Sequence, residues 1–310
     1  MSLVFIVKSS IRRKSAFYQL AEEFRSYGLF EQIEIRETER HQHAVTLAFQ
    51  AAREGFQYVI AVGGDGTLNE VINGVMAHKE TLSVIGFLPF GSANDFSRSL
   101  PCFYSAAEIA EAIRVGKFYS CDLGFLNSVD LESKTIKNWF VNVFDAGIGA
   151  VVVKKINRSQ KWLGARIAYA QAIFTTFLTY APSEARILID GTEYKKKIMT
   201  IVVANGKGFG NGLIIAPDSK LDDGKFDIII IGNVGVFQYL KYISRIRKGE
   251  KVIHPEVIYL CGKQLSIEPV GHSLMVEYDG EFGGYAPASV DMHRSAIKLL
   301  IPVESNNSGC

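Results

Sequence analysis

Up to about residue 124, apolar residues follow two alternating spacings along the chain. Short runs rich in β-branched residues, such as YVIAV at 58–62, are typical of buried strands in a parallel sheet. Between them, apolar residues recur three and four positions apart, the spacing of one helix face. Strands alternating with helices predict right-handed βαβ units, and hence a three-layer α/β domain with a parallel sheet. The expected strands are 3–7, 33–35, 58–62, 84–88 and 118–123.

From about residue 126 the apolar runs are separated by turns rather than by helical segments. Asp190-Gly191 lies between two such runs and is a strong signal for a β-hairpin. Two segments with helical spacing, at roughly 162–180 and 234–247, interrupt the series. This half is predicted to form an antiparallel β-sandwich or barrel.

These patterns divide the 310 residues into two domains. The α/β domain is expected over 1–124 and the β-sandwich domain over 125–289, while the final strand, at about 290–303, is expected to return to the first domain. A hydrophobic content of 48% supports a core in each. The last seven residues, ESNNSGC, are expected to be disordered.

Charge and cysteine content narrow the class of protein. A net charge of +2, without a basic stripe interleaved with aromatic residues, argues against a nucleic-acid partner. The start, MSLVFIVKSS, lacks the features of a signal peptide, and no apolar run reaches the 18 residues of a membrane-spanning helix. The four cysteines lie far apart and form no CxxC pair, which fits a reducing cytoplasm: Cys102, Cys121, Cys261 and Cys310.

The most informative motif is GGDGT at 63–67, which follows one predicted strand and opens a predicted helix. Such a turn offers free backbone N–H groups and the positive end of the helix dipole, and both suit a phosphate. The Asp65 carboxylate would repel phosphate unless a cation lies between them, so the motif also suggests Mg²⁺. The alternative is an ordinary glycine-rich turn, because the motif is neither a Walker A loop nor a GxGxxG fingerprint.

A second polar loop, residues 89–96, follows the strand at 84–88 and is expected at the same edge of the sheet. Ser92, Asn94 and Asp95 bring a hydroxyl, an amide and a carboxylate to this edge. Asp122, near the end of the predicted fifth strand, would add another carboxylate. The alternatives are a turn whose side chains bond to their own backbone, and a solvated aspartate at the end of a strand.

Together these motifs resemble the catalytic domain of the diacylglycerol kinase family, which includes bacterial lipid kinases and the sphingosine kinases. GGDGT alone also occurs in NAD kinases, so the combination and its order along the chain carry the resemblance. The matching segments of the first half are GGDGTLNEVINGV (63–75), GSANDFSR (91–98) and CDLG (121–124). Those of the second half are Asn142-x-x-x-x-Gly147-x-Gly149, GKGFGNGLIIAPDSKLDDGKFDI (206–228) and Asp279-Gly280-Glu281.

The resemblance implies a nucleotide-binding α/β domain followed by a β-sandwich, with ATP in the cleft between them. Thr38 matches a threonine near the nucleotide, and Ser92 stands where the family usually has threonine. The family's phosphate loop is matched by Gly64, Asp65, Gly66, Thr67, Asn69 and Glu70.

The resemblance also implies metal and catalytic roles. Asp65, Asp95 and Asp122 match carboxylates of a Mg²⁺–water network around the phosphates. Glu281 matches the general base that takes the proton of a lipid hydroxyl as it attacks the γ-phosphate; the alternative is an exposed loop glutamate. A second metal site is matched by the Asp223 carboxylate and the backbone carbonyls of Lys220 and Lys225, for which a plain turn is the alternative.

One segment departs from the family pattern. Many members carry Asn-Pro-x-x-Gly after the first strand, whereas residues 8–12 here read Lys-Ser-Ser-Ile-Arg, without proline or glycine. Side-chain charge from Lys8, Arg12 or Arg13 would then replace backbone contacts to phosphate; otherwise the loop serves another phosphodonor or a weaker activity.

Two segments are candidates for a membrane surface. Residues 167–180 are apolar but too short to span a bilayer, and Arg158, Lys161 and Arg166 precede them. The segment VFQYLKYISRIRKGEK is aromatic and basic. Both are expected either to dock on an anionic membrane or to pack on the sandwich with a solvated basic face.

The sequence therefore predicts an ATP-dependent, Mg²⁺-requiring lipid kinase that is cytoplasmic and peripherally associated with a membrane. Two alternatives stay open: an NAD kinase-like enzyme, and a catalytically silent regulator that binds lipid or nucleotide. The retained Asp65, Asp95, Asp223 and Glu281 argue against the silent protein. Neither the lipid nor the formation of a homodimer follows from the sequence.

Overall fold

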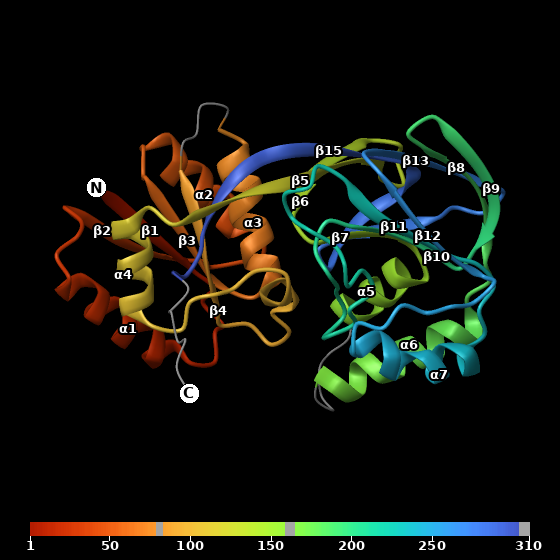
Figure 1. Ribbon diagram of the computed structural model, residues 1–310, viewed down its shortest axis with the longest axis horizontal. Helices are drawn as coiled ribbons and strands as arrows, with labels where there is room; N and C mark the ends of the chain where they lie inside the picture. The colour runs from red at the N-terminus through yellow and green to blue at the C-terminus, as the bar shows by residue number, and fades with distance from the viewer. Residues whose placement is uncertain (79–82, 159–164, 304–310) are drawn as a thin grey trace. The chain divides into compact units, whose positions relative to one another are not determined.

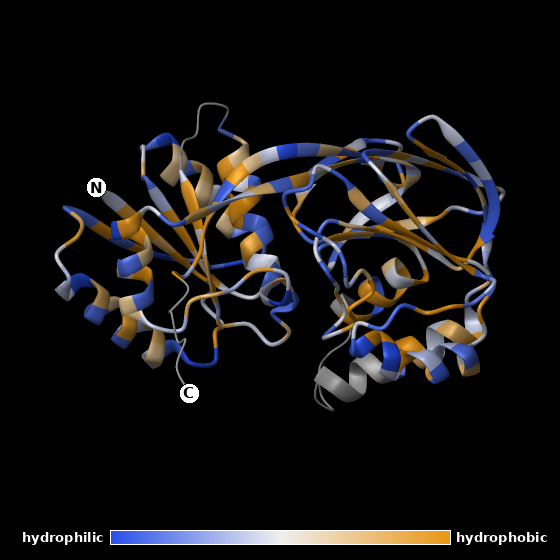
Figure 2. Cartoon of the chain, viewed as in Figure 1, coloured by the Kyte–Doolittle hydropathy of each residue, from blue (hydrophilic) through white to orange (hydrophobic). Residues whose placement is uncertain are grey.

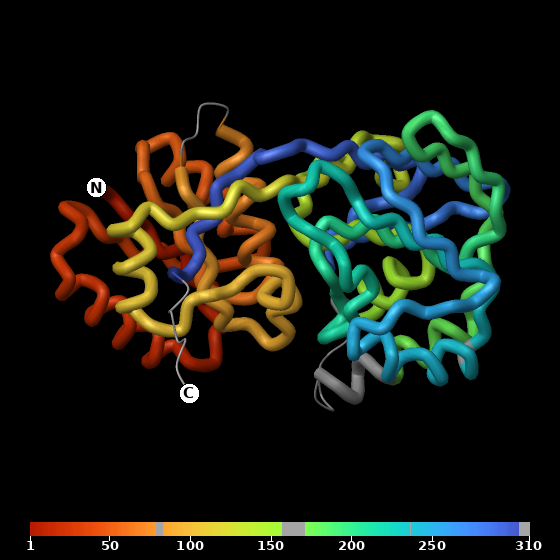
Figure 3. The backbone as a smooth tube through the Cα atoms, viewed as in Figure 1, coloured from red at the N-terminus to blue at the C-terminus, as the bar shows by residue number. Residues whose placement is uncertain are grey.

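A computed structural model describes residues 1–78, 83–158 and 165–303 (Figure 1). The chain forms two compact units. Unit 1 contains residues 1–121 together with the segment from Ser295 onwards, and unit 2 contains Asp122–Arg294. The polypeptide passes between them twice, along two long strands (Figure 3). These strands are β5 (Phe118–Val129) and β15 (Glu281–Leu300).

Unit 1 is built on a parallel sheet with the strand order β2-β1-β3-β4-β15. Two pairs of helices pack on it, α1 with α4 and α2 with α3. The strands are β1 (Ser2–Val7), β2 (Gln32–Glu37), β3 (Tyr58–Gly63) and β4 (Val84–Pro89). The helices are α1 (Lys14–Ser26), α2 (His43–Arg53), α3 (Asp65–Met76), the short 3₁₀ helix η1 (Asp95–Arg98) and α4 (Ala106–Val115). The α/β expectation is confirmed.

Alternating residues of β1 explain one face of this sheet. Leu3, Phe5 and Val7 are fully buried and pack in one apolar cluster with α1 and α4. Phe5 meets the ring of Phe17 edge to face, with 5.5 Å between centroids. Every β1 position after Ser2 is buried, as expected for a central strand of a parallel sheet that is covered on both faces.

The predicted fifth parallel strand is wrong. Residues 118–123 belong to β5, which pairs antiparallel with β6 (Thr135–Phe140) and also pairs with β15. The place beside β4 is taken by the end of β15, where Lys298 lies opposite Val84 in parallel register. An apolar run predicts a strand but not its partner, because the partner here is far away along the chain.

Unit 2 is an antiparallel, strand-rich domain, as predicted. One series of paired strands runs β12-β11-β10-β7-β14-β15, and a second runs β9-β8-β13-β15. Asp190 and Gly191 both have positive φ and join β8 to β9 in the predicted two-residue hairpin. The strands are β7 (Val143–Gly147), β8 (Ser183–Ile189), β9 (Thr192–Ile198), β10 (Thr200–Ala204), β11 (Phe226–Ile231), β12 (Val257–Gly262), β13 (Gln264–Val270) and β14 (Met275–Tyr278).

Three helices accompany the strands of unit 2: α5 (Ile148–Arg158), α6 (Ala165–Thr179) and α7 (Val236–Arg247). α6 and α7 correspond to the two predicted helical segments. Residues 162–164 of the first segment, and Lys161 before it, lie outside the described residues. α5 was not expected, because its sequence IGAVVVKKI is rich in β-branched valine and isoleucine, which favour strands. The predicted disorder of 304–310 also concerns residues that the structure does not describe.

Buried apolar side chains form the core of each unit. Figure 2 colours much of the strands of both units as hydrophobic. Unit 2 has one large buried cluster between its strands and a smaller one around Val143, Val202 and Ile229. No helix within the described ranges is long and apolar enough to cross a membrane.

Candidate functional site

The GGDGT motif forms the start of α3, which begins at Asp65 with Gly64 as its N-cap. Gly64 has no side chain with which to cap the helix. The Thr67 N–H donates to the Gly64 carbonyl oxygen at 2.9 Å, which leaves the Gly66 N–H of the first turn for another acceptor. The preceding glycine is required by close packing, because a Cβ atom at Gly63 would lie 2.4 Å from the Thr67 hydroxyl oxygen. The turn therefore presents the positive end of a 12-residue helix at the carboxyl edge of the sheet.

The second polar loop packs directly against this turn. A Cβ atom at Gly91 would lie 2.4 Å from the Cα of Gly64, so the two backbones touch and position 91 needs glycine. A Cβ atom at Gly64 would lie 3.3 Å from the Cα of Gly91, which is a tight contact. Asn94 has a left-handed backbone, and its amide donates to the carbonyl oxygens of Pro89 and Gly91, each at 3.1 Å. Its Oδ1 atom is buried and accepts no hydrogen bond within the described part of the chain.

The Asp65 carboxylate joins the two loops. Its oxygens accept the backbone N–H groups of Asp95, at 3.0 Å, and Phe96, at 2.9 Å, and so hold the start of η1. Burial raises the pKa of Asp65, and the Asp95 charge raises it further, against the lowering effect of the two N–H donors. Asp95 is itself buried, with one carboxylate oxygen 3.6 Å from Nε of Arg98.

This edge suits a phosphate with a bridging cation. Two neighbouring carboxylates and a buried amide oxygen are the oxygen donors that Mg²⁺ prefers. Because protein sites for Mg²⁺ usually supply one or two carboxylates and leave the rest to water and phosphate, Asp65 and Asp95 fit the ion. A protein cage does not form: no three His, Cys, Asp or Glu side chains cluster for a metal in the ranges described above.

Three other predicted nucleotide residues of unit 1 form hydrogen bonds within the protein. Thr38 is buried, and its hydroxyl accepts the backbone N–H of Ser9 at 3.3 Å, which ties the 8–12 loop to the end of β2. Glu70 accepts the backbone N–H of Ala44 at 3.1 Å and so caps the first turn of α2. Asn69 is buried and accepts the side-chain amide of Asn73, whereas Ser92 is exposed. Their roles in binding stay predictions.

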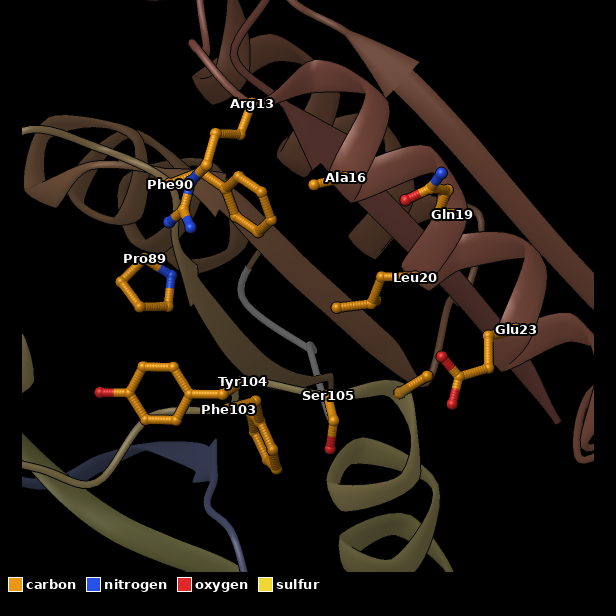
Figure 4. A pocket seen from close by; sticks show the side chains of 11 residues that line it. Arg13, Ala16, Gln19, Leu20, Glu23, Pro89, Phe90, Phe103, Tyr104 and Ser105 are labelled. Carbon is orange, nitrogen blue, oxygen red and sulfur yellow. The ribbon is translucent and has the colours of Figure 1, made fainter.

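The basic loop before α1 borders a pocket of about 330 Å³ (Figure 4). The Arg13 guanidinium lies 5.5 Å from the centroid of the Phe90 ring, and Figure 4 shows it folded against that ring. This contact engages Arg13 with the loop after β4. The pocket is lined by Arg13, Ala16, Gln19, Leu20, Glu23, Pro89, Phe90, Phe103, Tyr104, Ser105 and Ala106.

In unit 2, Asp122 holds the turn at 220–225. Its carboxylate accepts the backbone N–H of Gly224 at 2.7 Å, and its own N–H donates to the Leu221 carbonyl at 2.6 Å. Asp122 is fully buried, in the interior of β5. The prediction that it lies at the end of a fifth parallel strand is therefore wrong, because its carboxylate and N–H group are bonded to the 220–225 turn.

That turn carries two exposed carboxylates, Asp222 and Asp223, of which Asp223 is the predicted metal ligand. Asp223 accepts the backbone N–H of Lys225 at 3.3 Å, and its other oxygen lies 3.7 Å from Nζ of Lys225. Gly224 has a φ of +73°, so the tight turn depends on glycine. One carboxylate with backbone carbonyls, including those of Lys220 and Lys225, is a donor set that suits a weakly held oxygen-seeking cation.

The Asp279-Gly280 turn that carries Glu281 is held by hydrogen bonds from residues 141–143. Both turn residues have positive φ, and they join β14 to β15 with Tyr278 opposite Glu281. The Asp279 carboxylate accepts three backbone N–H groups at 2.9 Å each, from Val141, Asn142 and Val143. This anchoring places Glu281 at the first position of β15 and leaves its side chain partly exposed.

Two buried acidic residues beside this turn were not predicted from the sequence. Asp145 of β7 and Glu277 of β14 are cross-strand neighbours, and both are almost completely buried. Asp145 accepts the Thr200 hydroxyl at 2.7 Å, and Glu277 accepts the backbone N–H of Gly280 at 2.9 Å. Burial raises the pKa of Asp145 to about 7 and that of Glu277 well above its ordinary value. The available signal was a lone acid inside each apolar strand.

Family models match both parts of the chain. The diacylglycerol kinase catalytic domain matches residues 3–126, and the YegS C-terminal NAD kinase beta sandwich-like domain matches 142–301. The chain belongs to the diacylglycerol kinase family. Membership explains why the GGDGT, LDDG and DGE segments occur in this order, since they fall inside the two matched regions.

Relatives of the family cover most of the chain. A diacylglycerol kinase of Bacillus subtilis is 27% identical over 263 residues, which are 84% of this chain and 83% of the relative. One from Staphylococcus aureus is 29% identical over 81% of this chain and 76% of its own.

Solved structures extend the likeness to the fold. A diacylglycerol kinase from Bacillus anthracis superimposes with a TM-score of 0.69 and 20% identity, covering 97% of this chain and 96% of that one. Yeast NADH kinase, solved with NADH, superimposes with a TM-score of 0.55 and 8% identity, covering 99% of this chain and 84% of that one. The shared architecture is therefore wider than the family.

Proposed function

We propose that this protein is a lipid kinase that transfers the γ-phosphate of ATP to a lipid hydroxyl, with diacylglycerol as the model acceptor. The observation that carries the proposal is the start of α3. There, in a member of the diacylglycerol kinase family, an uncapped helix N-terminus lies beside the carboxylates of Asp65 and Asp95. Such an edge suits a nucleoside triphosphate with its cation.

In unit 1 the backbone N–H groups of Gly64 and Gly66 would bind phosphate oxygens, with Thr67 beside them, and Asp65 and Asp95 would hold Mg²⁺. When bound, the ion would neutralise negative charge that develops on the phosphates during transfer. Asp65 has a double task, because the same carboxylate keeps the 91–98 loop against the turn. Thr38, Asn69, Glu70 and Ser92 are the proposed surroundings of the nucleotide.

In unit 2 Glu281 is the proposed general base. The lipid O–H bond breaks as the proton passes to the Glu281 carboxylate, a new P–O bond forms to the γ-phosphorus, and the bond to the departing ADP oxygen breaks. The Asp279 anchor, with three N–H donors, keeps Glu281 in place for this step. Asp122 would act through the 220–225 turn, where Asp223, Lys220 and Lys225 would bind a second cation.

The test is transfer of radiolabelled phosphate from ATP to a panel of acceptors in mixed micelles. The panel contains diacylglycerol, a sphingoid base, phosphatidylglycerol and a polyprenol, with NAD as a soluble acceptor. We expect one lipid to be labelled in a Mg²⁺-dependent reaction and NAD to remain unlabelled. Labelling of NAD alone would replace the proposal with an NAD kinase, whose fold this chain shares. Binding of ATP and lipid without any transfer would identify a silent regulator.

A further inference from the structure

Unit 2 carries a group of large apolar side chains that its own core does not use. Phe174 and Leu178 of α6, Phe237 and Leu240 of α7, and Ile253 beyond α7 are all exposed; we call them the apolar ridge. Phe237 is 85% exposed and Ile253 is 88% exposed. α6 and α7 are in contact (Figure 1). Ile253 is next to His254, whose ring nitrogen lies 3.3 Å from the Gln238 amide nitrogen of α7, so the ridge residues belong to one region of unit 2.

The spacing along each helix separates the ridge from the packing surface. Phe174 and Leu178 are four residues apart on α6, and Phe237 and Leu240 are three apart on α7, so each pair shares a helix face. Other residues hold the helices together: the Phe177 and Tyr239 rings lie 4.7 Å apart. α7 is in turn attached to the smaller core cluster by Ile246. The fold is thus complete without the ridge.

Basic side chains accompany the ridge on α7. The helix contains Lys241, Arg245 and Arg247 and no acidic residue, and Lys248 follows it. All four are exposed. Only Arg245 has an acidic partner among the ion pairs found in the described residues near this helix, namely Glu250 at 2.9 Å. Large apolar side chains next to cations without acidic partners suit a binding surface with an apolar interior and a negatively charged outer layer.

We propose that the apolar ridge docks on an anionic lipid membrane, with the basic residues of α7 at the headgroups. Apolar side chains enter the boundary between headgroups and acyl chains, while lysine and arginine gain electrostatic attraction to acidic lipids. An apolar face alone would equally suit a second copy of the chain, but the positive charge of α7 would repel an identical α7 and favours an anionic surface. The biological role of this docking surface rests on the proposed lipid kinase function. The binding of these side chains to a membrane does not depend on that function.

The experiment is sedimentation of the full-length protein with vesicles. We expect binding to phosphatidylglycerol–phosphatidylcholine vesicles, weak binding to pure phosphatidylcholine, and loss of binding as salt is raised. The double variant Phe237→Ser/Leu240→Ser should lower the affinity by about tenfold or more, because it removes two of the inserted groups. Leu131→Ser is the matched control: Leu131 is 80% exposed in the β5–β6 turn and should bind like the wild type.

Three results would overturn the proposal: equal binding to both vesicle types, unchanged binding by the double variant, or loss of a dimer by the double variant without a change in vesicle binding. Because all substituted residues are exposed, the thermal unfolding temperature should match the wild type in every variant. Vesicle binding is measured without ATP. A protein that binds anionic vesicles but phosphorylates no lipid would therefore refute the proposed function while leaving the docking surface intact.

Discussion

At the scale of single residues, two predicted site carboxylates and one carboxylate of a family motif are parts of the scaffold as well. Asp65 holds the start of η1, Asp122 holds the 220–225 turn, and Asp279 binds three backbone N–H groups. A sequence motif records that a carboxylate is present but not whether its oxygens face a ligand or a backbone amide. The motif residues of both units were predicted from sequence, whereas these internal bonds were not, because they join segments far apart along the chain.

For Asp65 this gives a specific expectation. Asp65→Ala leaves the N–H groups of Asp95 and Phe96 without their acceptor, so the 91–98 loop should exchange its amide hydrogens faster. Turnover should fall sharply, and stability should fall by about 1–3 kcal/mol. Hydrogen exchange and steady-state kinetics check this, with the exposed Glu111→Ala of α4 as control. Wild-type turnover combined with a loosened loop would show that Asp65 is only structural.

For Glu281 the expectation concerns the chemical step. Glu281→Gln keeps the shape and hydrogen-bonding capacity of the side chain but cannot take the proton of the lipid hydroxyl. Positioned bases contribute about 10²–10⁴-fold, and a loose transition state favours the low end, so kcat should fall about 10²-fold while the KM for ATP stays nearly constant. Steady-state kinetics measure both. A variant with unchanged kcat and weakened ATP binding would make Glu281 a binding residue and place the base elsewhere.

At the scale of elements, local sequence signals correctly predicted most helices, strands and turns. They did not predict which strands pair with one another. The strand-helix alternation of unit 1 and the Asp190-Gly191 hairpin follow from periodicity and turn chemistry. The partner of β5 and the helix α5 did not follow, since both depend on what the rest of unit 2 packs against them.

The capping box of α4 is a local signal that can be tested directly. The Ser105 hydroxyl accepts the backbone N–H of Glu108 at 3.2 Å, and Glu108 accepts the N–H of Ser105 at 3.3 Å. Ser105→Ala should therefore destabilise unit 1 by about 1 kcal/mol. Denaturant unfolding measures this change. Ser105→Asp, which restores an acceptor, should recover most of it; equal losses in both variants would argue against capping.

The acid pair between β7 and β14 predicts a pH dependence of stability. Asp145 has a folded pKa of about 7, above its ordinary value of 3.8, so between these values the folded protein binds more protons than the unfolded chain. Its contribution to stability is complete below about pH 4 and is lost as the pH rises through about 7. The raised pKa of Glu277 acts in the same direction.

Thermal unfolding of the wild type between pH 5 and pH 8 should accordingly show a falling transition temperature for unit 2. Asp145→Asn keeps one acceptor oxygen for the Ala150 N–H, and its Nδ2 can donate to the Thr200 hydroxyl, which still has the Ala146 carbonyl oxygen as an acceptor at 3.2 Å. Because the amide cannot ionise, this variant should flatten the slope. Asp222→Asn, an exposed substitution in the same unit, should leave the slope unchanged. A slope that survives in the Asp145→Asn protein would assign it to other groups.

At the scale of the whole molecule, the end of the chain completes the sheet of unit 1. Ile297, Leu299 and Leu300 are buried there, and Lys298 pairs with Val84. Leu299→Ala should therefore lower the stability of unit 1 by about 2–5 kcal/mol through the cavity it leaves, with little effect on the unfolding of unit 2. Differential scanning calorimetry separates the two transitions. The exposed Lys298→Ala is the control, and a parallel loss in both units would show that they unfold as one.

The late return of β15 also orders events during synthesis. A ribosome makes β4 long before residues 297–300, so β4 waits with one edge unpaired while all of unit 2 is translated. An open, apolar strand edge is the usual template for aggregation. Unit 2, whose strands all precede the last few residues, can finish first. The nascent protein should therefore depend on chaperones that shield the β4 edge, and this dependence should end when the final strand leaves the exit tunnel.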